Sequence, residues 1–239
     1  MMHPPDARLF LADQRGRSET HERRSLHTLN FGDYVAEGRE PFGPLGLFNE
    51  EVLRAGARLS LRTEAPTAVL LLPVTGGVAW TYGAQTEYLA PGQAGVWALP
   101  AGAAYSVANP YETEFIEYLH LGFTPSPGGL GPAMQRHEFE LTEDAGLQPL
   151  LPAGAAGPGV RLFLGRFAGR EEGTYPIILP AGARGGVFVF VLQGVFEVAN
   201  RLLHDRDALA LPYASTDELA FEALAPDSML LVLEWARGT

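Results

Sequence analysis

The sequence has 239 residues, of which 46% are hydrophobic and 19% are charged, so the chain can bury a core as one large or two small domains and is neither disordered nor fibrous. The formal net charge of −11, without a run of basic residues, disfavours direct binding to nucleic acid or to an anionic membrane. The sequence contains no Lys and no Cys. This excludes Schiff-base catalysis on lysine, thiol nucleophiles, disulfides and cysteine metal sites.

The segment Met1 to Arg24 is polar and charged, without an apolar stretch of signal-peptide length. No later apolar run is long enough to span a bilayer. We therefore expect a cytoplasmic protein.

Short apolar or alternating runs separated by Gly, Pro and Asn predict β-strands in two groups. The first group lies between Gly56 and Phe123, at Ala68 to Leu72, Val78 to Tyr82, Gly95 to Leu99 and Phe115 to Leu121. The second group lies at Val187 to Leu192, Val195 to Val198, Ala208 to Leu211, Leu219 to Ala223 and Met229 to Trp235. Each group is typical of a small barrel or sandwich, so the chain is predicted to be all-β.

A local repeat favours an internal duplication. The string Ala55-Gly56-Ala57-Arg58 recurs as Ala181-Gly182-Ala183-Arg184, and each copy precedes a strand-turn-strand centred on a glycine, Gly76 or Gly194.

The region between the two groups is rich in Gly and Pro at Thr124 to Pro132 and at Leu151 to Pro158, which predicts loops. A strand is expected from Gln135 to Leu141 and one short helical turn within Asp144 to Leu151. The expected organisation is an N-terminal domain over 1–123, a linker with a crossing strand over 124–158, and a C-terminal domain over 159–239.

One motif resembles the second cupin motif, PxGxxHxxxN. The segment from Pro100 through Gly102 and Tyr105 to Asn109 keeps its spacing, but Tyr105 stands where that motif has a metal-binding His. The Pro and Gly shape a tight turn, and the position three after the Gly is expected to point into the barrel.

The layout of the first cupin motif, with its HxH core, is found upstream between Gly56 and Gly76, where the two His positions are occupied by Arg62 and Glu64. Alternate residues of a strand share one face, so this pair would aim a cation and an anion where HxH aims two imidazoles. Two interpretations stay open: a polar anchor for an anionic or hydroxylated ligand, or an ion pair that fills the space of a lost metal.

The leading segment narrows the resemblance to one branch of the cupins. Leu26-His27-Thr28-Leu29-Asn30-Phe31-Gly32-Asp33-Tyr34, then Phe42-Gly43-Pro44-Leu45, then Phe48-Asn49-Glu50-Glu51 running on to Gly56, is similar to the opening of pirins and bacterial pirin-like quercetinases. The resemblance continues in order through Asn109-Pro110 and Gln135 to Phe139, and on to Gly165.

The resemblance implies a bicupin, with two tandem jelly-roll-like β-barrels and one metal, usually iron, in the N-terminal barrel. Some pirins oxidise flavonols such as quercetin, and some act as nuclear cofactors. The family's four ligand positions fall here on Arg62, Glu64, Tyr105 and Val107. Arg and Val cannot ligate iron, so no metal cofactor is expected.

His120 is the one further residue included in the expected pocket. By alternation it shares a strand face with Tyr118 and Ile116, and it is either a replacement ligand or an ordinary hydrogen-bonded histidine. His27 is interpreted as structural, and Glu50 and Glu51 as part of a family turn and poor catalytic partners.

The leading hypothesis is a pirin-like bicupin that lacks the usual metal site and binds a small molecule, without a catalytic residue of its own. Its expected ligand-binding residues are Arg62, Glu64, Tyr105, Val107 and His120. One alternative is a metal-dependent quercetinase-like dioxygenase with an unorthodox site that includes Glu64, Tyr105 and His120. Another is a protein-interaction scaffold.

Overall fold

The computed structural model describes residues 7–125, 134–213 and 215–237. In these residues the chain is built from strands, with two short 3-10 segments, η1 (Ala12–Gln14) and η2 (Glu143–Ala145), and no α-helix. Consequently, none of the described helices has the length and apolarity needed to cross a membrane. Part of the loop predicted for Thr124 to Pro132 lies outside the described residues.

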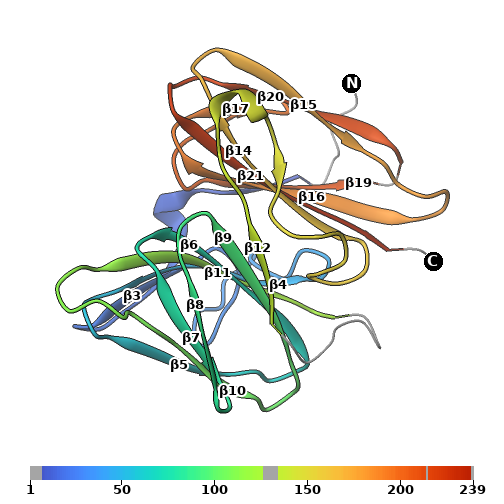
Figure 1. Ribbon diagram of the computed structural model, residues 1–239. Helices are drawn as coiled ribbons and strands as arrows, with labels where there is room; N and C mark the ends of the chain where they lie inside the picture. Colours follow the sequence, from blue (N-terminus) through green and yellow to red (C-terminus); the bar gives the residue numbers. More distant parts are fainter. Residues whose placement is uncertain (1–6, 126–133, 214, 238–239) are drawn as a thin grey trace. The chain divides into compact units, whose positions relative to one another are not determined.

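The chain divides into two compact units. Arg15–Phe139 with Ala155–Pro158 form one unit, here called the N-terminal barrel. Met1–Gln14, Glu140–Gly154 and Gly159–Thr239 form the other, here called the C-terminal barrel. Each unit combines a larger antiparallel sheet with a four-stranded sheet, which is the two-barrel, all-β architecture predicted from the sequence (Figure 1).

The larger sheet of the N-terminal barrel has the order β12-β9-β6-β11-β4-β3-β2, and its smaller sheet has the order β5-β10-β7-β8. The strands are β2 (Gly16–Glu19), β3 (Arg23–His27), β4 (Leu45–Leu53), β5 (Arg58–Arg62), β6 (Thr67–Thr75), β7 (Val78–Tyr82), β8 (Gln85–Leu89), β9 (Gln93–Leu99), β10 (Ala104–Ala108), β11 (Ile116–Phe123) and β12 (Gln135–Glu138).

The C-terminal barrel repeats this pattern, with sheets β1-β19-β16-β21-β14-β13 and β15-β20-β17-β18. Its strands are β1 (Arg8–Phe10), β13 (Gln148–Pro149), β14 (Val160–Phe167), β15 (Glu171–Ile177), β16 (Arg184–Gln193), β17 (Phe196–Val198), β18 (Arg201–Leu203), β19 (Ala208–Tyr213), β20 (Asp217–Ala223) and β21 (Ser228–Arg237).

The matching strand orders support the internal duplication, with β5 to β11 corresponding to β15 to β21. Gly76 and Gly194 occupy equivalent turns, after β6 and after β16, and both have a positive φ that favours glycine. The repeated tetrapeptides do not correspond, because Arg58 begins β5 whereas Arg184 begins β16. The repeated tetrapeptide therefore marks a similar turn before a strand in each barrel, but the two strands that follow it are not equivalent in the duplication.

The observed units differ from the expected domain ranges at the N-terminus and in the linker. Strand β1 pairs with β19, so the start of the chain belongs to the C-terminal barrel instead of the N-terminal domain. Strand β12 pairs with β9, so the crossing strand expected in the linker belongs to the N-terminal barrel. Single-sequence periodicity finds strands, but it does not reveal which sheet edge each one joins.

The alternation of apolar residues gives each barrel a core between its two sheets. In the N-terminal barrel Trp80, Trp97, Val107 and Tyr118 are among the fully buried residues of that core. The interior face of the large sheet also carries a group of buried polar residues on β3, β4 and β11, and this group forms the candidate site.

Candidate functional site

Two rows of buried polar side chains cross the large sheet of the N-terminal barrel. The first row joins His27 on β3, Asn49 on β4 and His120 on β11, which are direct cross-strand partners. The second row joins Ser25, Glu51 and Tyr118 on the same three strands. All six residues are at most 1% exposed. Successive positions of one strand alternate between faces, so these rows lie on the interior face that also carries Ile116 and Leu53 of the core.

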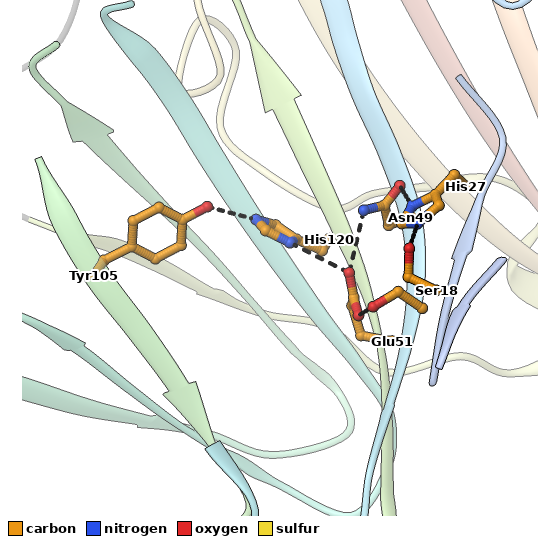
Figure 2. A network of polar contacts seen from close by, with 7 residues as sticks. Ser18, His27, Asn49, Glu51, Tyr105 and His120 are labelled. Carbon is orange, nitrogen blue, oxygen red and sulfur yellow. Dashed lines mark hydrogen bonds and ion pairs between the residues drawn. The ribbon is translucent and has the colours of Figure 1, made fainter. Parts of the chain in front are cut away.

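These side chains form a continuous polar chain (Figure 2). The amide nitrogen of Asn49 donates to Glu51 at 3.2 Å, which leaves the Asn49 carbonyl oxygen as the acceptor from Nδ1 of His27 at 3.0 Å. Nε2 of His27 then accepts from the hydroxyl of Ser18 at 2.9 Å. Ser18 is exposed, so the chain of contacts begins at the surface and ends inside the barrel.

Glu51 is the common acceptor of this polar chain. Ser25 donates to one carboxylate oxygen of Glu51, and Asn49 donates to the other. Nδ1 of His120 lies 3.9 Å from that second oxygen. This distance is too long for a hydrogen bond, and Nδ1 of His120 has no hydrogen-bond partner in the described residues. With a proton on Nδ1, which faces the carboxylate, Nε2 of His120 is the ring nitrogen that accepts a hydrogen bond.

Tyr105 supplies that bond from the opposite sheet. Its hydroxyl lies 3.0 Å from Nε2 of His120, and Figure 2 shows the ring reaching across from β10 toward His120 on β11. Burial, and then the nearby charge of Glu51, raise the pKa of Tyr105 well above its ordinary value of 10.0. The hydroxyl therefore stays protonated and donates to His120, so Tyr105, His120 and Glu51 form a connected set of three side chains.

Two further polar groups in this core have no hydrogen-bond partner in the described part of the chain. They are the hydroxyl of Tyr118 and the indole N–H of Trp80, both on fully buried side chains. Burial, followed by the charges of Glu51 and Tyr105, raises the pKa of Tyr118 as well, so both groups are neutral donors. Unpaired buried donors are unfavourable by about 1–3 kcal/mol each, which makes them candidates for contact with a polar ligand.

The structure brings together only part of the expected pocket. Tyr105 and His120 are in contact, and Val107 is fully buried in the same core. Arg62 and Glu64 are exposed and form no ion pair with each other in the described residues. The guanidinium of Arg62 instead donates to the carbonyl of Gly102 at 2.8 Å.

The placement of Arg62 and Glu64 inside the barrel is therefore corrected. On β5 the inward positions are Leu59 and Leu61, which pair with Val107 and Tyr105 respectively, and Arg62 points away from the core. A shift of one residue along a strand moves every side chain to the other face. The motif spacing located the strand correctly, but it predicted that Arg62 points inward, whereas the inward residue is its neighbour Leu61.

The residues at this position do not fit the metal ion of the resembled family. Leu59, Leu61 and Val107 offer no donor atom, and Tyr105 is engaged with His120. Over the described ranges, no group of three or more His, Cys, Asp or Glu side chains could hold a metal ion. The donor set suits hydrogen bonding to a molecule better than chelation.

The sequence interpretation missed Glu51 and undervalued His27. Glu51 lies within β4 and not in a turn, as one of three consecutive polar residues, Asn49, Glu50 and Glu51, that are all buried in an otherwise apolar strand. His27 is buried between the rings of Phe31 and Tyr34, at centroid distances of 5.3 and 6.0 Å. The available signal was the pair of alternating polar patterns Ser-x-His and Asn-x-Glu in neighbouring strand runs.

Comparison with known proteins supports the fold. No protein-family model matches this sequence, and no curated protein matches it. The crystal structure of YhhW from Escherichia coli is similar over 98% of both chains, with a TM-score of 0.82 and 19% identity. Bacterial pirin YhhW in complex with nickel(II) is similar over 96% of this chain and 98% of that chain, with a TM-score of 0.77 and 20% identity.

A quercetin 2,3-dioxygenase from Acinetobacter baumannii is also similar, over 98% of this chain and 86% of that chain, with a TM-score of 0.71 and 15% identity. Identities this low establish a shared architecture and leave the activity to be argued from the site. The resemblance to pirins is therefore confirmed in the fold, and the chain has the two-barrel cupin architecture of bacterial pirins.

Proposed function

We propose that this protein binds a small molecule in its N-terminal barrel by hydrogen bonding, without the metal that the resembled family uses. The observation that carries the proposal is the buried set of Tyr105, His120 and Glu51, in which Tyr105 occupies one of the four positions that match the family's metal ligands. The hydrogen bond to His120 fixes the orientation of the Tyr105 hydroxyl in advance, which lowers the entropy lost on binding.

The ligand class follows from the side chains around Tyr105. Trp80 and Tyr82 pack edge-on against Trp97, with ring centroids 5.1 and 5.5 Å away, so aromatic surface lies beside the polar groups. Tyr82 and Leu61 flank Tyr105 on its neighbouring strands and are half-buried. Aromatic side chains beside a few buried polar groups suit a planar, hydroxylated aromatic molecule.

We propose no catalytic residue for this site and expect no dioxygenase activity. A metal-dependent dioxygenase is the second candidate, favoured by the fold shared with the Acinetobacter baumannii quercetin 2,3-dioxygenase. The expected site of that alternative included Glu64, which is exposed and does not join Tyr105 and His120. We also propose a cytoplasmic location and a small-molecule partner; the net charge of −11 disfavours direct binding to nucleic acid or to an anionic membrane.

Metal analysis and quercetin binding on the same untagged sample test the proposal. We expect iron and nickel far below one ion per chain, no quercetin-dependent uptake of dioxygen, and saturable quenching of the Trp80 and Trp97 fluorescence by quercetin. Stoichiometric metal together with turnover would establish the dioxygenase instead. Absence of quenching by quercetin and by simpler phenols would reject ligand binding in this barrel.

A matched pair of variants ties binding to the site. His120→Leu removes the acceptor of the Tyr105 hydroxyl, and we expect about tenfold weaker quercetin binding. His137→Leu makes the same chemical change on β12 at the edge of the sheet and should leave the affinity unchanged. Equal affinities for both variants would argue against the proposed site.

A further inference from the structure

A groove on the N-terminal barrel lies apart from the polar rows. It has a volume of about 580 Å³ and is lined by residues at the ends of β2, β3 and β4 and in the segment before β11. The lining residues are Glu19, Thr20, Arg23, Arg24, Val52, Arg54, Ala55, Thr113 and Phe115. None of these residues belongs to the set around Tyr105, so the groove is a separate feature with a volume in the range of small-molecule sites.

Three arginines concentrate positive charge in this groove, although the protein as a whole carries a formal net charge of −11. The side chains of Arg23, Arg24 and Arg54 make no hydrogen bond or ion pair within the described residues. Glu19, the carboxylate among the described lining residues, is the cross-strand partner of Arg24 and forms an ion pair with Arg17, so it offsets at most one of the three positive charges. Three unpaired guanidinium groups in one groove favour an anionic ligand.

The rest of the groove is apolar. Val52 and Ala55 line it beside Phe115, whose side chain is 56% exposed. Val52 is the direct cross-strand partner of Arg24, so a cationic and an apolar side chain stand next to each other. An exposed aromatic ring beside unpaired arginines suits a ligand that has both a carboxylate and a flat apolar body.

We propose that this groove binds small aromatic carboxylates, with the carboxylate held by Arg24 and Arg54 and the ring packed on Phe115. The proposal is independent of the function proposed for the barrel interior. Thr20 and Thr113 add hydroxyl groups at the same groove. Because charge attraction carries the binding, affinity falls as ionic strength rises.

Calorimetric titration with 2-naphthoate tests this site, with 2-naphthamide as the uncharged probe of the same shape. We expect one 2-naphthoate per chain, no detectable binding of the amide, and at least tenfold weaker binding of the acid to Arg54→Gln. Phe115→Ser should weaken binding several-fold at unchanged salt dependence. Equal binding of acid and amide would overturn the proposal.

Two further variants separate this groove from other sites. Arg58→Gln removes an exposed arginine on β5, outside the groove, and should leave the affinity for 2-naphthoate unchanged. Tyr105→Phe alters the barrel interior and should also leave it unchanged, so failure here and failure of the proposed function are distinguishable. Loss of affinity in Arg58→Gln equal to that in Arg54→Gln would indicate only a general charge effect and reject the groove. Melting curves of each variant check that the fold is retained.

Discussion

Each barrel has a glutamate that is only 1% exposed, Glu51 in the N-terminal barrel and Glu234 in the C-terminal barrel, and the two are stabilised differently. In the C-terminal barrel Glu234 is 1% exposed and receives contacts from the guanidinium of Arg161 and the hydroxyl of Tyr175. In the N-terminal barrel Glu51 is equally buried, and its contacts come from Ser25, Asn49 and His120. One carboxylate is thus paired with a cation, and the other is held by neutral donors.

The difference shows how a barrel can be closed or kept available for a ligand. Glu234 uses the hydroxyl of Tyr175 directly, so that tyrosine has no hydroxyl hydrogen left to offer. In the N-terminal barrel Tyr105 likewise gives its hydroxyl hydrogen to His120, but the hydroxyl of Tyr118 and the indole N–H of Trp80 have no hydrogen-bond partner in the described residues. An ion pair in which every polar group has a partner is structural. A row of polar side chains that includes donors without a partner favours the binding of a polar ligand.

The largest expected effect comes from replacing the two glutamates. Glu51→Gln replaces one of the two oxygens that accept from Ser25 and Asn49 by an NH2 group, so one of these buried donors faces another donor, and we expect a loss of about 2–4 kcal/mol in the free energy of unfolding. Glu234→Gln should lose only about 1 kcal/mol, because the side chain of Arg161 is 40% exposed and remains hydrated.

Urea unfolding combined with amide hydrogen exchange in β4 and β21 measures the two barrels separately, since they need not unfold together. Equal losses for both variants would break the proposed distinction between the barrels.

High pH should destabilise both barrels, because each contains two tyrosines whose pKa is raised mainly by burial, Tyr105 and Tyr118 in the N-terminal barrel and Tyr175 and Tyr213 in the C-terminal barrel. The pKa values of Tyr105 and Tyr118 are raised above 10.0 by burial, so the folded state keeps protons that the unfolded chain releases. Their stabilisation is fully present below pH 10 and is lost as pH rises toward the folded pKa values, at about 1.4 kcal/mol per pH unit for each tyrosine. Tyr118→Phe should halve this slope for the barrel, as measured by urea unfolding between neutral and strongly alkaline pH; an unchanged slope would contradict the burial of Tyr118.

The two tyrosines of the N-terminal barrel should differ from each other at neutral pH. Tyr105→Phe leaves Nε2 of the buried His120 without its partner and is expected to cost about 1 kcal/mol. Tyr118→Phe removes a hydroxyl without a partner in the described residues, so it is expected to be neutral or to stabilise by up to about 1 kcal/mol. Thermal unfolding of both variants checks this difference, and the reverse order would show that the Tyr118 hydroxyl is bonded.

The smallest effect concerns the outer face of the C-terminal barrel. Glu222 on β20 lies directly opposite Glu172 on β15 and Glu197 on β17. Glu222 also lies 3.8 Å from the guanidinium of Arg170, whose side chain is 82% exposed, so this ion pair contributes little. Like charges in cross-strand positions repel, so Glu222→Gln should raise stability by a few tenths of a kcal/mol at low salt and by less at high salt. A salt-independent gain would exclude charge repulsion as its cause.

The sequence predicted the fold well, because strand periodicity depends on local alternation. Val78 to Tyr82 was predicted with the observed bounds of β7, and the glycine turns at Gly76 and Gly194 follow from φ angles that glycine tolerates. The pairing of β1 with β19 was beyond reach, because nothing local in Arg8 to Phe10 specifies a partner about two hundred residues away.

The site was predicted only in part. Tyr105 was located by its spacing from Gly102, and His120 by strand alternation, and the two side chains meet. Arg62 was misplaced because a motif fixes a strand more firmly than its register. The role of Glu51 was not predicted, because strand pairing brings its partners Ser25 and His120 beside it, and the sequence of one segment does not reveal that pairing.

The most direct test of the central claim is the dissociation constant of quercetin for two tyrosine variants, Tyr105→Phe in the N-terminal barrel and Tyr175→Phe in the C-terminal barrel. Both changes remove one buried hydroxyl that has a hydrogen-bond partner. We predict that Tyr105→Phe weakens binding about tenfold and that Tyr175→Phe leaves it unchanged. Equal affinities of Tyr105→Phe and the unaltered protein, or a loss confined to Tyr175→Phe, would contradict the account.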